Sequence, residues 1–240
     1  MENEWDTILE QYICNVISPD GRDTFESTQK LIDEIMNVAN ISADNVVLDM
    51  GCGWGNVTRV CATKTSHTVI GIEPNFQNIE EAKQRSKEYN INYIQGSFEK
   101  PGFDKKADII ISSLAFHQVN YEYKSHALKS IGDMLNTSGR FILCDVMLFF
   151  NAQQDVLKFN HVYRYLLKKT TPKSVYTKYI APYIDETHIY TWEDMKAYTP
   201  KDFWFYSLDD IRNWLQENNL IITKQQSLCP FFGILTIEHI

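Results

Sequence analysis

One run of residues, Val46 to Asn56, constrains the fold more than any other part of the chain. It reads Val-Val-Leu-Asp-Met-Gly-Cys-Gly-Trp-Gly-Asn, an apolar stretch that ends in an acidic residue and opens into three alternate glycines. Because glycine has no Cβ, the backbone can turn sharply there and a ligand can approach the main chain closely. A buried strand followed by such a turn is typical of a nucleotide-binding loop in an α/β fold.

The spacing of the glycines separates two classes of nucleotide-binding loop. A dinucleotide-binding loop needs G-x-G-x-x-G, but Asn56 occupies the place of its third glycine. Gly51, Gly53 and Gly55, preceded by Asp49, instead follow the pattern D/E-x-G-x-G-x-G. In this pattern the segment resembles the class I S-adenosylmethionine-dependent methyltransferases. A tight strand-to-helix turn that binds no ligand is the alternative interpretation of the glycines.

The resemblance implies both a fold and a cofactor. The fold would be α/β, with a Rossmann-like, doubly wound and mostly parallel seven-stranded sheet whose last strand is antiparallel. The cofactor would be S-adenosylmethionine, with S-adenosylhomocysteine as its product. A carboxylate two residues before the first glycine would repel a pyrophosphate but suits the cationic amino group of a methionine moiety. The expected cofactor contacts in this loop are Asp49, Gly51, Cys52, Gly53 and Gly55.

The second predicted strand adds a candidate contact for the ribose of adenosine. A β-branched segment from Thr68 to Ile72 closes on Glu73 and Pro74. An acid at the end of this strand can accept hydrogen bonds from both ribose hydroxyls. Glu73 could instead be a solvated acid at the start of a helix over residues 75 to 89, because helix N-termini favour negative charge.

Two later segments complete the predicted site. After a strand at 91–95, Ser97 and Phe98 match the family positions that hold the adenine, although many relatives carry Asp in place of Ser97. The apolar strand that begins at Ala107 ends near Ser113, a further candidate cofactor contact, and leads to His117. We predict His117 as the catalytic residue, because an imidazole titrates near neutral pH and can act as a general base. The alternative is that His117 only packs beneath the methionine moiety.

The length and composition of the chain fit a single domain. With 240 residues, of which 44% are hydrophobic, the chain can bury a full core. We expect N-terminal helices over 1–43, a cofactor-binding core over 44–146, a lid or substrate insertion over 147–205, and a C-terminal helix and strand pair over 206–240.

The N-terminal segment is predicted to hold two helices, over 4–17 and 24–39. Ser18 to Gly21 carry turn chemistry between them. Asp23 and Glu26 suggest a capping box at the start of the second helix. The aromatic residues that could cover the cofactor, or else simply pack on an amphipathic helix, are Trp5 and Tyr12.

The predicted lid is dense in aromatic and basic residues. Its aromatic residues are Tyr163, Tyr165, Tyr176, Tyr179, Tyr183, Tyr190, Trp192 and Tyr198. Its basic residues are Lys158, Arg164, Lys168, Lys169, Lys173 and Lys178. Aromatic walls suit a small organic substrate, and the basic residues suggest an anionic one. A solvated, charged helix face is the alternative for the basic residues.

Composition narrows the remaining classes of partner. The formal net charge of -8 argues against a nucleic-acid-binding surface. The five cysteines have no C-x-x-C spacing and the six histidines are dispersed, so we predict no disulfide framework and no metal site. The longest apolar stretch, Phe141 to Phe150, contains Asp145 and is too short for a bilayer, so we expect no membrane partner and a cytoplasmic location. The oligomeric state is left open.

The sequence therefore predicts a metal-independent enzyme that transfers a methyl group from S-adenosylmethionine to a small molecule. A cofactor-binding or scaffold protein of the same fold, without turnover, is the alternative from a non-enzymatic class. A nicotinamide-dependent oxidoreductase is a further alternative, disfavoured by Asn56 and Asp49.

Overall fold

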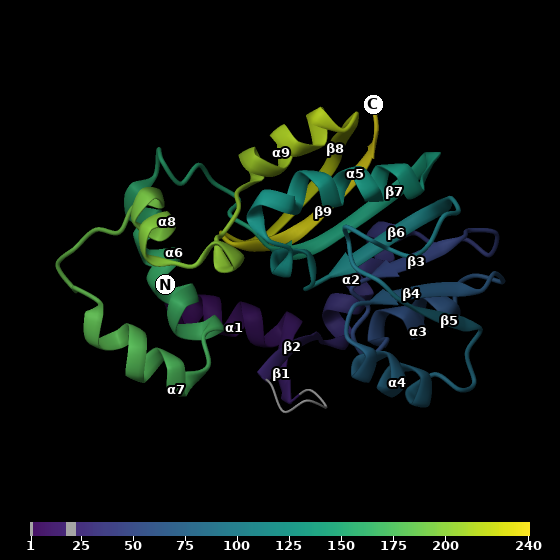
Figure 1. Ribbon diagram of the computed structural model, residues 1–240, viewed down its shortest axis with the longest axis horizontal. Helices are drawn as coiled ribbons and strands as arrows, with labels where there is room; N and C mark the ends of the chain where they lie inside the picture. Colours follow the sequence, from purple (N-terminus) through teal and green to yellow (C-terminus); the bar gives the residue numbers. More distant parts are fainter. Residues whose placement is uncertain (1, 18–22) are drawn as a thin grey trace.

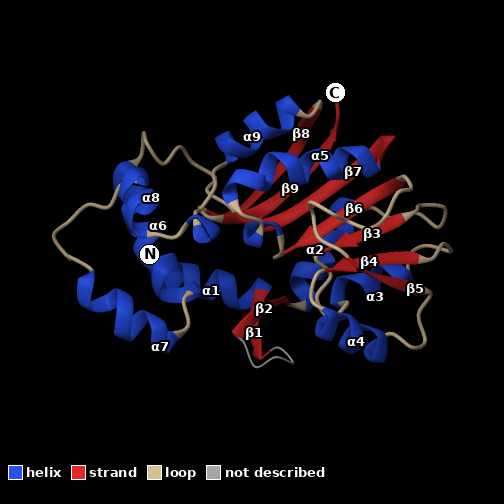
Figure 2. Ribbon diagram, viewed as in Figure 1, coloured by secondary structure: helices blue, strands red, loops and turns tan. Residues whose placement is uncertain are grey.

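The computed structural model describes residues 2–17 and 23–240. A seven-stranded sheet crosses the molecule, with helices on both faces (Figures 1 and 2). Its strands are, in spatial order, β5 (Ile91–Gln95), β4 (Val69–Glu73), β3 (Val47–Met50), β6 (Ala107–Ser113), β7 (Leu135–Val146), β9 (Phe232–His239) and β8 (Leu220–Cys229). The pairs from β5 to β7 are parallel, and β9 runs antiparallel to both of its neighbours. The predicted fold, including the antiparallel last strand, is confirmed.

Each face of the sheet is buried in its own core, which explains why its strands are apolar without alternation. Val47 of β3 packs in one core and the next residue, Leu48, packs in the other. One face is covered by α2 (Gln29–Ala39), α3 (Asn56–Ala62) and α4 (Phe76–Arg85). The opposite face is covered by α5 (Lys124–Met134) and α9 (Leu208–Glu217).

The order in which the chain adds strands to the sheet changes direction at β3. From β3 the chain builds β4 and β5 on one side, and then returns to place β6 on the other side. The segments that leave the carboxyl ends of β3 and β6 therefore diverge. In doubly wound folds this divergence opens a crevice where ligands bind.

The N-terminal segment departs from the predicted pair of helices. The first helix, α1 (Glu2–Tyr12), ends before the predicted residue 17, and two strands follow it, β1 (Ile13–Ile17) and β2 (Asp23–Ser27). These strands form an antiparallel hairpin, and β-branched residues such as Ile13 and Val16 favour the extended conformation. The predicted turn at 18–21 lies outside the described residues.

The start of α2 is also later than expected. Asp23 and Glu26 belong to β2, so the predicted capping box is wrong. The helix is capped by Thr28, whose side chain accepts a hydrogen bond from the backbone N–H of Leu31. A threonine at this position satisfies one of the free N–H groups of the first turn.

Between β7 and α9 the chain leaves the sheet and forms the predicted helical lid, which lies beside α1 (Figure 1). Its elements are α6 (Val156–Thr170), α7 (Lys173–Val175), η3 (Tyr176–Ile180), η4 (Ala181–Tyr183), α8 (Trp192–Tyr198) and η5 (Lys201–Phe203). Ser207 and Asp210 then form a capping box at α9. Within the described residues, no helix combines the length and the apolar character needed to cross a bilayer.

Candidate active site

A large cleft opens where β3 and β6 diverge, and it extends beneath the lid. Its volume is about 2280 Å³. Ten of the predicted site residues line it, namely Asp49, Gly51, Cys52, Gly53, Glu73, Pro74, Ser97, Phe98, Ser113 and His117. Gly55 does not line the cleft. The sequence motifs that follow β3, β4, β5 and β6 thus meet in one place.

The three glycines of the loop have positive φ angles, but they serve different purposes. A Cβ on Gly51 would lie 2.4 Å from the Cβ of Ala115, and one on Gly55 would lie 2.1 Å from the hydroxyl of Tyr93. These two glycines allow close packing inside the fold. A Cβ on Gly53 would meet only an oxygen of Glu26, at 3.4 Å. Gly53 is therefore the glycine whose backbone is open to a ligand.

Asp49 is buried at the end of β3 and is held by the following helix. The hydroxyl of Thr58 donates to its Oδ2 at 2.6 Å, and 2% of the residue is exposed. Burial raises the pKa of Asp49 to about 7, although the hydrogen bond from Thr58 acts in the opposite direction. A carboxyl group with this pKa gains its charge readily when a cation binds beside it.

Glu73 connects the glycine loop to the start of α4. Its Oε2 accepts the backbone N–H of Gly53 at 3.1 Å, and its Oε1 accepts from the backbone N–H of Asn75 and the side chain of Asn78, each at 3.1 Å. Asn75 is the N-cap of α4. The side chain lies near a helix start and lines the cleft, but it is buried rather than solvated.

Phe98, Ser97 and Cys52 are further predicted contacts, and all three line the cleft. Phe98 packs edge-on against Phe116, with ring centroids 5.4 Å apart. The hydroxyl of Ser97 accepts the backbone N–H of Lys100 at 3.2 Å. The thiol of Cys52 is buried, and burial raises its pKa well above the ordinary value. This thiol is therefore in the neutral form.

The β1–β2 hairpin spans the crevice, which the sequence analysis did not foresee. Glu26 accepts a hydrogen bond from the side chain of Asn56 at the start of α3. The next residue, Ser27, shares a hydrogen bond of 2.9 Å with the hydroxyl of Ser113 at the end of β6. Burial raises the pKa of Glu26, and the bond from Asn56 opposes that rise. Because residues 24–27 were expected to be helical, no sequence signal placed this carboxyl group in the site.

His117 is oriented by a buried carboxylate that the sequence analysis did not assign to the site. Its Nδ1 lies 2.6 Å from Oδ1 of Asp145, and its backbone N–H donates to Oδ2 of the same residue. Asp145 has no exposed surface and also accepts the hydroxyl of Tyr206 at 3.0 Å. An ionised carboxylate only accepts hydrogen bonds, so it holds the proton on Nδ1 and leaves the lone pair on Nε2. We call this arrangement the His117–Asp145 pair.

A buried lysine supports the turn that carries His117. Lys124 of α5 donates to the carbonyl oxygens of Phe116, at 2.8 Å, and of His117, at 3.3 Å. Its Nζ lies 4.7 Å from the ring centroid of Phe116 and 4.6 Å from that of Tyr206. Burial lowers the pKa of Lys124 to about 7, and the charge of Asp145 partly offsets this effect.

The lid and α1 form the other wall of the cleft. Six of the eight aromatic residues singled out in the lid line it: Tyr163, Tyr165, Tyr179, Tyr183, Tyr190 and Tyr198. Of the six basic residues, only Lys169 does so, and it pairs with Asp6 at 2.8 Å. Trp5 packs edge-on against Tyr165 and Phe231 rather than lining the cleft. The packing interpretation of Trp5 is therefore the right one.

The cleft is rich in acidic side chains. Its acids are Asp6, Glu10, Glu26, Asp49, Glu73, Glu99 and Asp185. Across residues 2–17 and 23–240, no three His, Cys, Asp or Glu side chains are grouped so that they could hold a metal ion.

Known proteins resemble this chain in both sequence and fold. Residues 47–139 match a family model described as a methyltransferase domain. An uncharacterised methyltransferase of Alkaliphilus oremlandii is 32% identical over 138 residues, which are 57% of this chain and 62% of the relative. One from Staphylococcus carnosus is 30% identical over 139 residues, 58% of this chain and 63% of the relative. The chain thus spans somewhat less than two thirds of the length of these relatives.

Solved structures share the fold at low sequence identity. The magnesium protoporphyrin IX methyltransferase of Synechocystis, solved with bound S-adenosylmethionine, is 15% identical with a TM-score of 0.56, over 88% of this chain and 77% of that one. An S-adenosylmethionine-dependent methyltransferase from Clostridium acetobutylicum is 14% identical with a TM-score of 0.58, over 87% of this chain and 89% of that one. Residues 47–139 are therefore similar to a methyltransferase domain, and the chain shares the fold of solved S-adenosylmethionine-dependent methyltransferases.

Proposed function

We propose that this protein transfers a methyl group from S-adenosylmethionine to a nucleophilic atom of a small molecule, without a metal ion. The observation that carries the proposal is the cleft itself. It brings the Gly53 backbone and its surrounding carboxylates into the same space as the His117–Asp145 pair. Such a transfer requires a cofactor site, and a positioned base serves an acceptor that must lose a proton.

The residues present fit this cofactor. The backbone at Gly53 has room for a ligand, and the carboxyl groups of Glu26, Asp49 and Glu73 line the cleft around it. Negative charge suits a ligand that carries an ammonium and a sulfonium, whereas it would repel the pyrophosphate of a nicotinamide dinucleotide. In this assignment Asp49 and the loop hold the methionine part, Glu73 and Pro74 the ribose, and Ser97 and Phe98 the adenine.

The protein's own chemical contribution is orientation and proton transfer. S-adenosylmethionine supplies an electrophilic methyl group, whose bond to sulfur breaks as its bond to the acceptor forms, with the electron pair left on sulfur. His117 takes the proton of the acceptor on Nε2, and Asp145 stabilises the imidazolium that results. The cleft would hold the acceptor in line with the methyl group, and such orientation is worth about 7 to 11 kcal/mol of the activation barrier in favourable cases.

A ligand panel tests the cofactor assignment. Thermal unfolding is measured with S-adenosylmethionine, S-adenosylhomocysteine, NADH and NADPH at matched concentrations. A ligand at about a hundred times its dissociation constant adds about 2.7 kcal/mol to the free energy of unfolding. We expect the two adenosyl ligands to stabilise the protein and the nicotinamide cofactors to have no effect. Stabilisation by NADH or NADPH alone would contradict the proposal.

Turnover distinguishes an enzyme from a binding protein of the same fold. Candidate acceptors are screened by release of S-adenosylhomocysteine, and the best acceptor is assayed with His117→Ala. Loss of a general base should lower kcat by about 10²- to 10⁴-fold, while affinity for S-adenosylhomocysteine stays the same. His126→Ala is the matched control, because His126 is exposed on α5 and does not line the cleft. Activity undiminished in His117→Ala would rule out this role.

A further inference from the structure

The lid side of the cleft indicates the chemical class of the acceptor. We propose that the acceptor is an uncharged hydroxyaromatic compound with more than one ring, bound between the lid and His117. This inference rests on the proposed methyl transfer, because it names the molecule that would receive the methyl group.

The size of the cleft exceeds what one cofactor requires. Small-molecule sites in proteins usually enclose about 300–1,000 Å³, whereas this cleft measures about 2280 Å³. The residues assigned to the cofactor lie on one side, at the ends of β3 to β6. The space beneath the lid therefore remains for an acceptor that is at least as large as a typical ligand.

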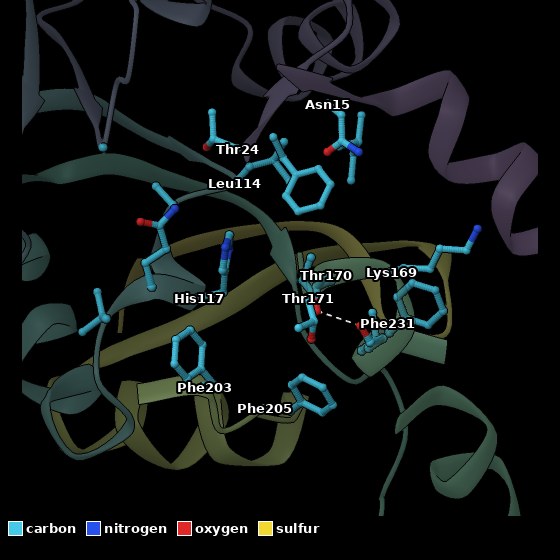
Figure 3. A pocket seen from close by; sticks show the side chains of 18 of the residues that line it. Asn15, Thr24, Leu114, His117, Lys169, Thr170, Thr171, Phe203, Phe205 and Phe231 are labelled. Atoms are coloured by element: carbon cyan, nitrogen blue, oxygen red, sulfur yellow. Dashed lines mark hydrogen bonds between the residues drawn. The ribbon is translucent and has the colours of Figure 1, made fainter. Parts of the chain in front are cut away.

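The lid lines this space with apolar surface that the protein itself leaves uncovered. Tyr179, Tyr183, Tyr198 and Phe203 all line the cleft, yet between 59% and 80% of each residue is exposed. Figure 3 shows Phe203 and Phe205 around the same open space as His117. Large exposed aromatic side chains gathered at one cavity are typical of a ligand-binding surface. Planar rings fill such a surface by stacking and edge-on contacts.

The charges on this side leave no free cation for an anionic acceptor. Lys169, the one lysine or arginine among the described cleft residues, is paired with Asp6. His188 lies 3.2 Å from Asp194, which is on the lid as well. Arg164 does not line the cleft, and it donates to the carbonyl oxygens of Asp185 and His188. A carboxylate or phosphate on the acceptor would thus be desolvated without a partner, which costs free energy.

The position of His117 selects a hydroxyl group on an aromatic ring. Nε2 has no hydrogen-bond partner among the described residues and belongs to a side chain that lines the cleft. A phenolic hydroxyl ionises near pH 10, so an imidazole can take its proton as the oxygen attacks. Deprotonation by His117 would place the proton on Nε2 and leave the electron pair on the acceptor oxygen.

Binding of model compounds tests the acceptor class without relying on turnover. The protein saturated with S-adenosylhomocysteine is titrated calorimetrically with 2-naphthol, phenol, 2-naphthoate and 1-naphthylmethylammonium. We expect 2-naphthol to bind at least tenfold more tightly than each of the others. Equal or tighter binding of phenol, of the anion or of the cation overturns the proposal, as does the absence of 2-naphthol binding.

Two variants locate the site. Phe203→Ala should weaken 2-naphthol binding about tenfold and leave the affinity for S-adenosylhomocysteine unchanged. Leu157→Ala is the matched control, because Leu157 is 61% exposed on the same lid but does not line the cleft. Equal effects of the two variants would contradict the assignment. If S-adenosylhomocysteine itself fails to bind, the proposed function fails, whereas cofactor binding with the wrong acceptor preference refutes only the present inference.

Discussion

At the scale of single residues, the glycine loop shows how one motif combines packing and binding. Gly51 and Gly55 make room for Ala115 and Tyr93, whereas a Cβ on Gly53 would meet only an oxygen of Glu26. The alternation of glycines therefore does not mean that each one meets the ligand. The sequence pattern cannot separate these roles, because the neighbours that separate them come from β5 and from the loop after β6.

The first prediction contrasts two of these glycines. Gly55→Ala should destabilise the protein by several kcal/mol, because the new Cβ would overlap the Tyr93 hydroxyl and the residue has a φ of 76°. Gly53→Ala should cost only about 1–2 kcal/mol, from its positive φ, but weaken S-adenosylmethionine binding at least tenfold. Chemical denaturation and calorimetry measure the two effects. Unchanged affinity in a folded Gly53→Ala variant would remove Gly53 from the cofactor site.

The second prediction concerns the buried charge behind His117. The pKa of Lys124 is lowered to about 7 by burial, so this lysine is charged at acidic pH and largely neutral above about pH 8. A positive charge there opposes protonation of His117. Lys124→Met should therefore move the acidic limb of the kcat/KM profile to higher pH, with a larger loss at pH 6 than at pH 9.

A purely structural role for Lys124 would lower kcat/KM equally at every pH. The control is Lys129→Met on the same helix, where the lysine is exposed and pairs with Asp133. That variant should leave the profile of kcat/KM against pH unchanged.

At the scale of elements, the β1–β2 hairpin connects the two sides of the cofactor crevice. Glu26 bonds to Asn56 on one side, and Ser27 bonds to Ser113 on the other. Glu26 Oε1 also lies 3.4 Å from the position of a Cβ on Gly53. The hairpin thus places a carboxyl group directly above the loop that is assigned to a cationic ligand.

The third prediction follows from this placement. Glu26→Gln keeps an acceptor for Asn56 but removes the negative charge, so we expect about tenfold weaker binding of S-adenosylmethionine, or about 1.4 kcal/mol, with little change in unfolding temperature. Glu10→Gln removes the same charge from α1, on the lid side of the cleft, and should have a much smaller effect. Equal losses of affinity for S-adenosylmethionine in both variants would indicate an effect of the overall negative charge of the cleft rather than a contact at Glu26.

At the scale of the whole molecule, the sheet and the lid contribute different halves of one cleft. The sheet half carries Asp49 and Glu73, which we assign to the proposed cofactor site, and the lid half carries exposed aromatic rings. The lid segment of α7, η3 and η4 makes its main contacts within itself. Segments with few contacts to the rest of a protein open at low free-energy cost.

The fourth prediction tests whether ligands stabilise the lid. Limited trypsin digestion should cut first after Lys173 and Lys178, which are exposed in this segment. Saturation with S-adenosylhomocysteine and 2-naphthol together should slow these cuts at least fivefold, because the acceptor would cover the surrounding apolar surface. Mass spectrometry of the fragments identifies the cut sites. First cleavage within the sheet, or no protection by the ligand pair, would contradict this view of the lid.

Local signals in the sequence were enough for the sheet and for most of the cofactor-side residues. The apolar strand before Gly51 and the acid at the end of β4 depend on neighbouring residues, whose backbone preferences act over a few positions. The resemblance to a known family implied the doubly wound fold and its antiparallel last strand. The N-terminal hairpin was missed because residues 13–17 and 23–27 become strands by pairing with each other.

The tertiary structure alone decided which distant groups act together. Asp145 reaches His117 from 28 positions along the chain, and Lys124 lies under the same turn only because α5 packs against β7. The tertiary structure also decided which lid residues line the cleft: most of the aromatic residues do, and most of the basic residues do not. The physical reason is the range of the forces involved. Backbone conformation follows from adjacent residues, whereas burial, charge compensation and the orientation of a side chain depend on what the folded chain places beside it.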